Sequence, residues 1–221
     1  MIKIVEVFNS IQGEGRYCGQ PATFIRFAGC NRNCSFCDTK YSQDGEYNEY
    51  SIDGLLDFLL QLGLKDHIVV TGGEPLFQSD VYSFIQRLKH SAPDKSIAME
   101  TNGDFLIKGD YVANSLFVLL RELDYIAVSP KDIKVAQIIR KWYDTALPYL
   151  KSKVEIKVVT DLSLLNVELV DYATMLMPLT SGAETVDKTV KQRVWEYCTT
   201  HNLRYSPRLH VEVWGYQKRG V

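Results

Sequence analysis

Ala22-Thr23-Phe24-Ile25-Arg26-Phe27-Ala28-Gly29-Cys30-Asn31-Arg32-Asn33-Cys34-Ser35-Phe36-Cys37 joins a strand-like run to a loop that carries three cysteines. The apolar and β-branched residues up to Ala28 predict a strand. The thiols of Cys30, Cys34 and Cys37 follow in one tight loop, with three and then two residues between them. A cube of four irons normally takes four thiolates, so three local ligands would leave one iron open to another ligand. The loop therefore predicts an iron–sulfur cluster at the end of a strand.

Two other interpretations of the cysteines stay open on spacing alone. A zinc site would need a fourth ligand. The candidates are Asp38, Cys18, Cys198 and the four histidines, none of them at an ordinary zinc-finger spacing. The pair Cys34 and Cys37 could form a redox dithiol, which leaves Cys30 unexplained. Five cysteines in 221 residues are few and odd in number, which argues against a disulfide framework.

Composition limits the class of protein. A chain of 221 residues with 46% hydrophobic residues suits one domain with a buried core. The formal net charge of −2 gives no basic field for nucleic acid. Charges within Met1 to Glu6 argue against a signal peptide, and no apolar run reaches the roughly 18 residues that a membrane span needs. With free thiols expected, we predict a protein of the reducing cytoplasm that binds neither nucleic acid nor membrane.

Short apolar runs alternate with longer stretches in which apolar residues recur at helical spacing. The predicted strands are Ala22 to Ala28, His67 to Val70, Ser96 to Met99, Tyr125 to Val128, Lys153 to Val159 and Thr174 to Met177. The predicted helices are Ile52 to Leu62, Val81 to Leu88, Ile133 to Trp142, Ser163 to Tyr172 and Val186 to Cys198. Such alternation predicts an α/β fold with parallel strands.

Small, polar or glycine residues directly follow five of these strands. They are Thr71 to Pro75, Glu100 to Gly103, Ser129 to Lys131, Thr160 and Asp161, and Pro178 to Thr180. In β/α barrels the reactive groups lie at the C-terminal ends of the strands, so we expect one shared mouth there. Six strands are too few for a closed eight-stranded barrel, and we predict an incomplete (β/α)6-type barrel in a single domain.

Thr71-Gly72-Gly73-Glu74-Pro75 is the second strong motif. Two glycines after a strand let the backbone approach a ligand closely. Together with the cysteine loop, this segment resembles the radical S-adenosylmethionine (SAM) superfamily. The resemblance implies a 4Fe-4S cluster held by the three cysteines, and SAM bound at the open iron. The SAM-binding residues that it implies are Phe36, Cys37, Asp38, Gly73, Glu74, Ser129, Pro130, Lys131, Met177, Pro178, Leu179 and Thr180.

The N-terminal Phe8-Asn9-Ser10-Ile11-Gln12-Gly13-Glu14-Gly15 narrows the resemblance. With the strand and cysteine loop that follow, it is similar to the 7-carboxy-7-deazaguanine synthase family, over essentially the whole chain. The family's reaction is a ring contraction of 6-carboxy-5,6,7,8-tetrahydropterin with loss of ammonia, in deazapurine (queuosine-type) biosynthesis. Residues 1–221 would then form one radical SAM core domain, with an N-terminal substrate-binding extension and a C-terminal closing segment.

The resemblance also implies roles around the substrate. The substrate-binding candidates are Ile11, Gln12, Gly13, Glu14, Arg26, Thr71, His210 and Val221. Gln12 can answer both amide and amine groups of a pterin, and Arg26 and His210 can pair with its carboxylate. Glu100 is a catalytic candidate, or else a structural partner for a lysine, Lys131 or Lys157.

Asp38-Thr39 follows the last cluster cysteine. In the family a threonine at this place helps to bind Mg²⁺, which prefers oxygen ligands and keeps several waters. The alternative for this pair is a simple cap or turn. The resemblance further implies a homodimer and an external electron donor of the flavodoxin or ferredoxin type. The use of the product, in tRNA or in DNA, stays open.

Two features depart from the resemblance or stay unplaced. Val211 follows His210, where the family often has a basic residue. Asn114 to Leu120 is apolar and could be a dimer surface or a cover. A glycyl-radical enzyme activase shares the cysteine spacing and is the alternative enzyme, although it leaves Gln12 to Gly15 unexplained. A non-catalytic iron–sulfur or zinc module would need the cysteines but not Thr71 to Pro75.

Overall fold

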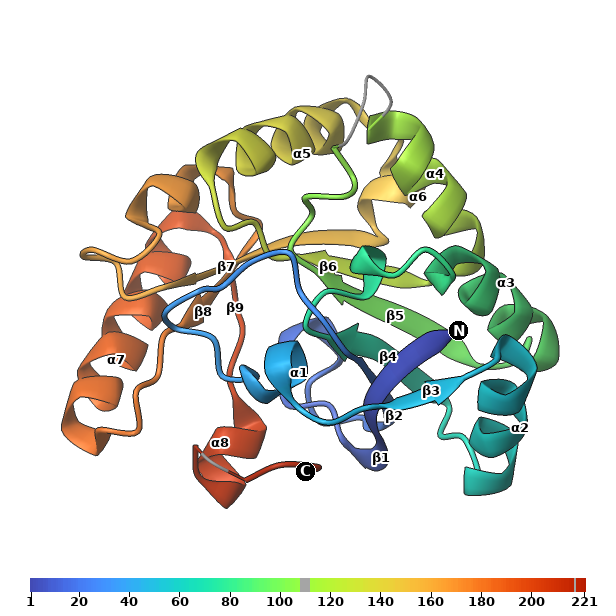
Figure 1. Cartoon of the computed structure of the whole chain (residues 1–221). Coiled ribbons are helices and arrows are strands. Elements are labelled where there is room, and N and C mark those ends of the chain that lie inside the picture. The colour runs from blue at the N-terminus through green and yellow to red at the C-terminus, as the bar shows by residue number, and fades with distance from the viewer. Residues whose placement is uncertain (108–111, 217) are drawn as a thin grey trace.

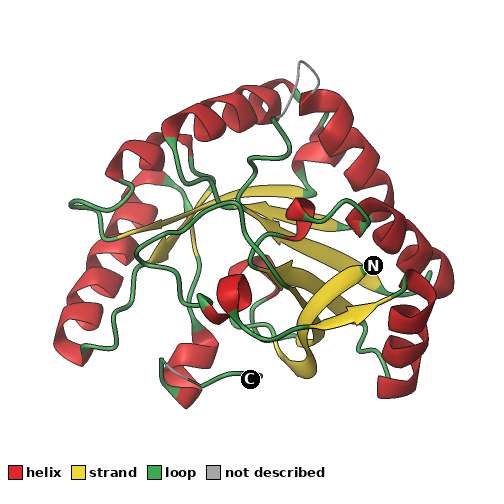
Figure 2. Ribbon diagram, viewed as in Figure 1, coloured by secondary structure: helices red, strands yellow, loops and turns green. Residues whose placement is uncertain are grey.

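The computed structural model describes residues 1–107, 112–216 and 218–221, and Figure 1 traces the chain. The strands of this part of the chain form one sheet in the order β3-β1-β2-β4-β5-β6-β7-β8-β9. Helices cover the outer face of the curved sheet, and loops gather on its inner side (Figure 2). No helix within the described ranges is long and apolar enough to cross a membrane.

Neighbouring strands from β2 to β9 pair in parallel. Their bounds are β2 Pro21–Phe27, β4 His67–Gly72, β5 Ser96–Thr101, β6 Tyr125–Val128, β7 Val154–Thr160, β8 Met175–Pro178 and β9 Arg204–Tyr205. The first six correspond to the six predicted strands. The predicted α/β fold with an incomplete barrel is therefore confirmed, with a short seventh parallel strand that the sequence pattern did not indicate.

Two antiparallel strands extend the sheet beyond β2. They are β1 (Ile2–Ile11) and β3 (Asn48–Tyr50). In the β1–β2 pair Ile11 lies opposite Pro21, so β1 ends where β2 begins. The loop that follows β1 therefore starts at the N-terminal ends of the parallel strands.

The helices between strands bury one apolar face each against the sheet. They are α2 Ile52–Leu62, α3 Val81–Ser91, α4 Val112–Glu122, α5 Ile133–Thr145 and α7 Glu184–His201. In α2 the Ser51 hydroxyl caps the first turn by accepting from Gly54 N–H, and Leu55, Leu56 and Leu59 are buried. The main core lies between these helices and the outer face of the sheet.

The segment Asn114 to Leu120 lies in α4. The side chains of Asn114 and Ser115 are outside the described residues. Leu116, Leu119 and Leu120 are buried in the main core, whereas Phe117 and Val118 are about half exposed, at 49% and 51%. Most of the apolar character of this segment is thus explained by packing against the core.

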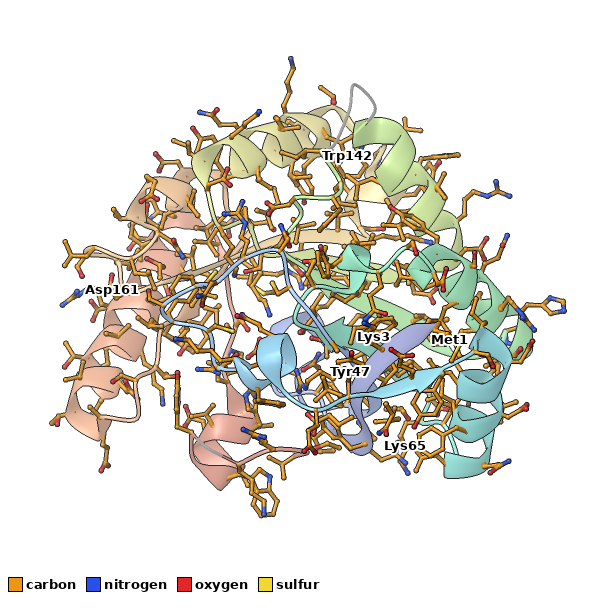
Figure 3. All side chains as sticks on the ribbon, viewed as in Figure 1. Met1, Lys3, Tyr47, Lys65, Trp142 and Asp161 are labelled. Atoms are coloured by element: carbon orange, nitrogen blue, oxygen red, sulfur yellow. The ribbon has the colours of Figure 1, made fainter. Side chains whose placement is uncertain are left out.

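The prediction of a helix over Ser163 to Tyr172 was wrong. Only a 3₁₀ helix, η3 (Val167–Tyr172), forms there. The Asp161 side chain, labelled in Figure 3, accepts from the backbone N–H groups of Ser163, Leu164 and Leu165. This local bonding competes with helix formation, and Asn166 adopts a left-handed φ of 54° before η3.

Short elements at the two ends of the barrel complete the chain. They are η1 Gly15–Tyr17, α1 Tyr41–Asp44, η2 Pro75–Phe77, α6 Pro148–Lys151 and α8 Leu209–Trp214. Side chains alternate along each strand, so every second residue faces the barrel interior. On β7, for example, Lys157 and Val159 line the interior pocket, whereas Ile156 packs in the outer core.

Candidate active site

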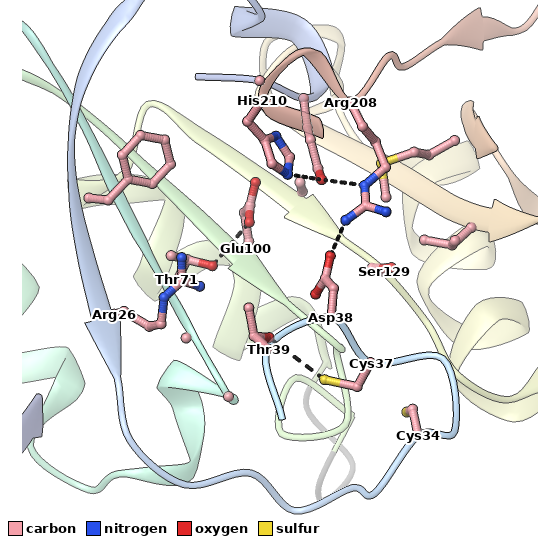
Figure 4. A pocket seen from close by; sticks show the side chains of 18 of the residues that line it. Arg26, Cys34, Cys37, Asp38, Thr39, Thr71, Glu100, Ser129, Arg208 and His210 are labelled. Atoms are coloured by element: carbon pink, nitrogen blue, oxygen red, sulfur yellow. Dashed lines mark hydrogen bonds and ion pairs between the residues drawn. The ribbon is translucent and has the colours of Figure 1, made fainter. Parts of the chain in front are cut away.

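One pocket of about 500 Å³ collects residues from the ends of the parallel strands, the cysteine loop, the loop after β1 and the C-terminal segment (Figure 4). The predicted site residues that line it are Ile11, Gln12, Gly13, Glu14, Arg26, Cys30, Cys34, Phe36, Cys37, Asp38, Thr39, Thr71, Gly73, Glu100, Ser129, Lys131, Met177, Leu179, His210 and Val221. Glu74, Pro130, Pro178 and Thr180 are not part of its lining. The expected shared mouth is present.

The three cysteines of the loop carry free thiols that line this pocket. Burial raises the pKa of the Cys30 thiol, and the neighbouring Cys34 and Cys37 add to this effect. Such thiols favour the thiolate form only when a cation compensates them. Within the described ranges no three His, Cys, Asp or Glu side chains converge on one point for a single metal ion. The three thiols lie on one loop and line the same space, which is the local donor set that a cube of four irons can use.

The glycine motif lies against the cysteine loop. Gly73 N–H donates to Phe27 O (3.0 Å), and Glu74 N–H donates to Gly29 O (2.9 Å). A Cβ on Gly73 would lie 2.1 Å from Gly29 O, which only glycine avoids. Gly72 has a φ of 140°, outside the range that other residues adopt readily. Both glycines therefore let the strand end approach the cysteine loop.

Glu74 does not line the pocket. Its carboxylate accepts from Thr101 Oγ1 (2.7 Å), Asn102 N–H (2.6 Å) and Leu76 N–H (3.1 Å). The side chain is fully buried, and this burial raises its pKa to about 7 despite the hydrogen bonds. Glu74 thus ties the end of β4 to the end of β5, and its predicted contact with SAM stays a prediction.

Ion pairs of one arginine hold the first half of the cysteine loop in place. The Arg32 guanidinium donates twice to Asp104, from Nε to Oδ2 and from Nη2 to Oδ1, each at 2.6 Å. It also pairs with Asp132, whose side chain caps α5 by accepting from Val135 N–H. A bidentate pair of this kind fixes direction as well as distance. Arg32 therefore orients the segment between Cys30 and Cys34.

Charged side chains fill the opposite half of the pocket. Glu14 accepts from Lys157 Nζ at 2.7 Å and from Arg208 Nε at 3.4 Å, and His210 Nε2 lies 4.0 Å from it. Burial alone would raise the pKa of Glu14, but the charges of Lys157, Arg208 and His210 outweigh it and lower this pKa to about 2. Glu14 is therefore a fixed carboxylate that can only accept hydrogen bonds.

Glu100 lies beside this group. It accepts from Thr71 Oγ1 at 3.0 Å and from Gln12 Nε2 at 3.4 Å, and Lys157 Nζ lies 3.8 Å away. The structure thus contains the pairing of Glu100 with Lys157 that the sequence suggested, with 3.8 Å between the charged atoms. Burial would lower the pKa of Lys157, but Glu14 and Glu100 together raise it.

Arg208 connects the two halves of the pocket. It donates to Thr180 Oγ1 (2.5 Å) at the end of β8, and it pairs with Asp38 as well as with Glu14. Arg208 is 6% exposed, and its contacts with Glu14 and Thr180 are shielded from water, whereas Asp38 is partly exposed. Thr180, which does not line the pocket, is held by Arg208 behind it.

A third set of contacts closes the side near β1. Arg26 Nε donates to Glu6 Oε1 (2.7 Å), which also accepts from Tyr41 Oη (3.0 Å). The Arg219 guanidinium lies 3.9 Å from the centre of the Tyr41 ring. The chain then continues to Val221 in the pocket lining. Arg26 thus has a protein partner in addition to the space that it lines.

Thr39 and Lys131 border the cysteines. Thr39 Oγ1 lies 3.6 Å from Cys37 Sγ. Lys131 Nζ donates to Ser129 Oγ (2.8 Å) and lies 5.5 Å from the centre of the Phe36 ring. Burial lowers the pKa of Lys131. These side chains offer a hydroxyl and a partly buried ammonium next to the cluster loop.

Comparison with known proteins gives the family. The model of the radical SAM superfamily matches residues 24–143. The 7-carboxy-7-deazaguanine synthase of Thermoplasma acidophilum is 32% identical over 96% of this chain and 97% of its own length. The chain belongs to the 7-carboxy-7-deazaguanine synthase family. The synthase of Pyrobaculum aerophilum is 29% identical over 97% of this chain and 95% of its own length.

Solved structures support the fold of this synthase-family member. QueE from Escherichia coli matches 95% of this chain and 94% of its own chain, with a TM-score of 0.65 and 23% identity. Membership of the radical SAM superfamily implies a 4Fe-4S cluster and SAM, so the zinc and dithiol interpretations are set aside. The glycyl-radical activase alternative is not favoured, because synthases match along the whole chain.

Several charged residues that line the site of the synthase-family chain are not predicted from the sequence, Lys157 and Arg208 among them. The sequence suggests Lys157 only as a partner of Glu100 and suggests no role for Arg208. A signal for Lys157 is present, because Glu155 and Lys157 share one face of a strand whose opposite face carries the apolar Val154, Ile156 and Val158. Arg208 stands two positions before His210, but nothing in its sequence neighbours indicates that it is buried.

Proposed function

We propose that this protein converts 6-carboxy-5,6,7,8-tetrahydropterin into 7-carboxy-7-deazaguanine. The product contains the atoms of the substrate less those of ammonia, so no external oxidant is required overall. The observation that carries the proposal is the match to synthases along the whole chain. The common pocket supports it, because cysteines for a cluster and a fixed carboxylate for a pterin line the same space.

The cofactors have candidate binding groups on opposite elements. Cys30, Cys34 and Cys37 would hold the cluster, and the backbone at Gly73 and the strand ends at Ser129 and Leu179 would meet SAM. When bound, the cluster and SAM supply the organic radical that removes hydrogen from C6 of the pterin. The protein contributes binding, orientation and exclusion of competing reactions.

Recognition of the pterin falls to the loop after β1. Glu14 stays ionised, so it accepts hydrogen bonds from the amine and ring N–H groups of the substrate. Gln12 carries both an acceptor and a donor, and its amide already lies beside Glu100. Arg26 and His210 are on the pocket wall and would pair with the substrate carboxylate.

Loss of ammonia requires a group that moves protons near the ring. We assign this role to Glu100, which is held by Thr71 and lies near Lys157. A carboxylate in reach of an ammonium and a hydroxyl can exchange a proton with either substrate or solvent. The same contacts fit a purely orienting role, which a pH–rate profile of Glu100→Gln would distinguish from proton transfer.

Mg²⁺, the dimer and the redox partner belong to the proposal as well. The Thr39 hydroxyl would bind Mg²⁺ together with the substrate and water. An external flavodoxin- or ferredoxin-like protein would supply the electron, and two copies would form a homodimer in the cytoplasm. The product would enter deazapurine (queuosine-type) biosynthesis.

An anaerobic assay tests the reaction. Reconstituted protein is given 6-carboxytetrahydropterin, SAM, Mg²⁺ and a reductant, and the product is identified by absorbance and mass. We expect 7-carboxy-7-deazaguanine and ammonia in equal amounts, with Cys34→Ala inactive and Cys198→Ala active. Cleavage of SAM without conversion of the pterin would contradict the proposal and would favour a different radical SAM substrate.

A further inference from the structure

The loop after β1 continues into a polar cluster at the base of the barrel that the proposed function does not use. Arg16 and Tyr17 of η1 follow Glu14 by two and three positions. The other members lie in the first two positions of their strands: His67 of β4, Tyr125 of β6, Glu155 of β7 and Arg204 of β9. This base cluster thus lies at the end of the barrel opposite to the cysteine loop.

Two ion pairs run from the pocket into the base cluster. Glu14 pairs with Lys157 at 2.7 Å, and Arg16 Nη2 lies 3.4 Å from Glu155 Oε2. Glu155 and Lys157 are two positions apart on β7 and therefore face the same side of the sheet. The loop thus lies alongside β7 inside the barrel. Glu14 and Arg16 of the loop each pair with a residue of opposite charge on β7.

Tyr17 fixes the loop from the other side. Its ring lies between His67, with the ring centres 4.4 Å apart, and Tyr125, with the centres 5.2 Å apart and the rings nearly perpendicular. Glu155, which is 3% exposed, also accepts from Tyr125 Oη at 3.1 Å. Aromatic contact and ion pair together hold η1 against three strands.

The base cluster fills this end of the barrel with polar groups, which lowers the stability of the folded state. Among the described residues, Arg16 Nε and His67 Nε2 are buried without a hydrogen-bond partner. Buried polar atoms without partners destabilise the folded state, so an apolar plug would be more stable. The polar filling instead gives the loop a defined register against β7.

We propose that Arg16 and Tyr17 are positioning residues for pterin recognition. By anchoring η1 at the base, they fix the positions of Gln12 and Glu14 along the barrel axis, in the pocket above. Gly15 alone separates Glu14 from Arg16, and this piece of chain spans at most about 7 Å, so a shift at the base acts on Glu14 through a single residue. The inference rests on the proposed function, in which Gln12 and Glu14 bind the pterin.

The test compares two arginines that pair with the same carboxylate. Arg16→Met removes the guanidinium that belongs to the loop, and Arg204→Met removes the one on β9, whose Nε lies 3.4 Å from Glu155 Oε1. We expect Arg16→Met to raise both the KM and the calorimetric dissociation constant for the pterin by about tenfold, as for a misaligned hydrogen bond to a charged group. Arg204→Met should leave both constants unchanged.

Three further measurements make the comparison decisive. The affinity for SAM and the iron content should stay at wild-type values in both variants, and Arg16→Lys should recover most of the pterin affinity. Equal pterin constants in Arg16→Met and Arg204→Met, while the wild type turns over, would overturn the inference and leave the proposed function intact. A wild type with a full cluster that does not convert the pterin would overturn the proposed function and, with it, this assignment.

Discussion

Thr39 lies two positions after the last cluster cysteine, and its hydroxyl borders both the Cys37 thiol and the pocket. We expect Thr39→Ala to weaken the stimulation of turnover by Mg²⁺ by about tenfold or more, the usual loss when a metal site is perturbed. Turnover is measured as Mg²⁺ is titrated. Thr39→Ser keeps the hydroxyl and serves as the control. An identical Mg²⁺ dependence in wild type and Thr39→Ala would exclude this hydroxyl as a ligand.

Glu14 predicts how stability depends on pH. Its pKa is about 2 in the folded protein and 4.5 ordinarily, so the folded state binds fewer protons than the unfolded state between these values. The stabilisation by Lys157 and Arg208 is therefore complete above pH of about 4.5 and is lost as the pH falls toward about 2.

Glu14→Gln isolates this contribution. We expect the variant to unfold at a lower denaturant concentration than wild type near pH 7, because Lys157 loses its closest buried partner. The difference between the two proteins should shrink as the pH falls from about 4.5 to about 2. The unfolding free energy of the cluster-free proteins is measured across this range. A difference that does not change with pH would contradict a lowered pKa.

At the scale of elements, the contact of Arg219 with Tyr41 holds the C-terminal segment near α1. A cation–π contact at such a site contributes about 0.5–1 kcal/mol. We expect Arg219→Ala to raise the pterin KM by roughly twofold to fivefold, since the segment that borders the pocket is held less firmly. Steady-state kinetics and a thermal melt are compared with Arg219→Lys. A lower melting temperature with an unchanged KM would show a structural role only.

The elements predicted from the sequence were those with a strong local pattern. Tyr125–Val128 and Ile52–Leu62 match β6 and α2 residue for residue, because apolar periodicity there agrees with burial. The strand β9 has two residues and carries no periodicity, so only its pairing with β8 defines it. η3 differs from the predicted helix because hydrogen bonds to Asp161 override an apolar pattern.

The candidate site was predictable to the extent that its residues lie in motifs at strand ends. The cysteines, Gly73 and Glu14 all border the pocket. The buried partners Lys157 and Arg208 were not assigned, since their importance arises from contacts between segments far apart in sequence. A motif identifies the residues that face a ligand better than the residues that hold them in place.

For the molecule as a whole, we expect binding of the cluster by the cysteines of the pocket to be coupled to folding. We expect Cys30→Ala, Cys34→Ala and Cys37→Ala each to abolish turnover and to lower iron content, because no spare thiol of the described chain lines the pocket. Cys198→Ala is the control, as Cys198 packs in a separate core cluster. Iron content, absorbance and melting temperature are measured after anaerobic reconstitution. Full iron retention in Cys34→Ala would contradict the assigned ligand set.

The two edges of the sheet, β3 and β9, have a consequence for the exit of the product. The described strands do not close into a ring, and the C-terminal segment and α8 lie beside the pocket instead. Movement of these parts breaks side-chain contacts such as Arg219 with Tyr41, whereas parting two paired strands would break a ladder of backbone hydrogen bonds. Release of the product should therefore follow the lower barrier, and the dwell time of the product should depend on how firmly the C-terminal segment is attached.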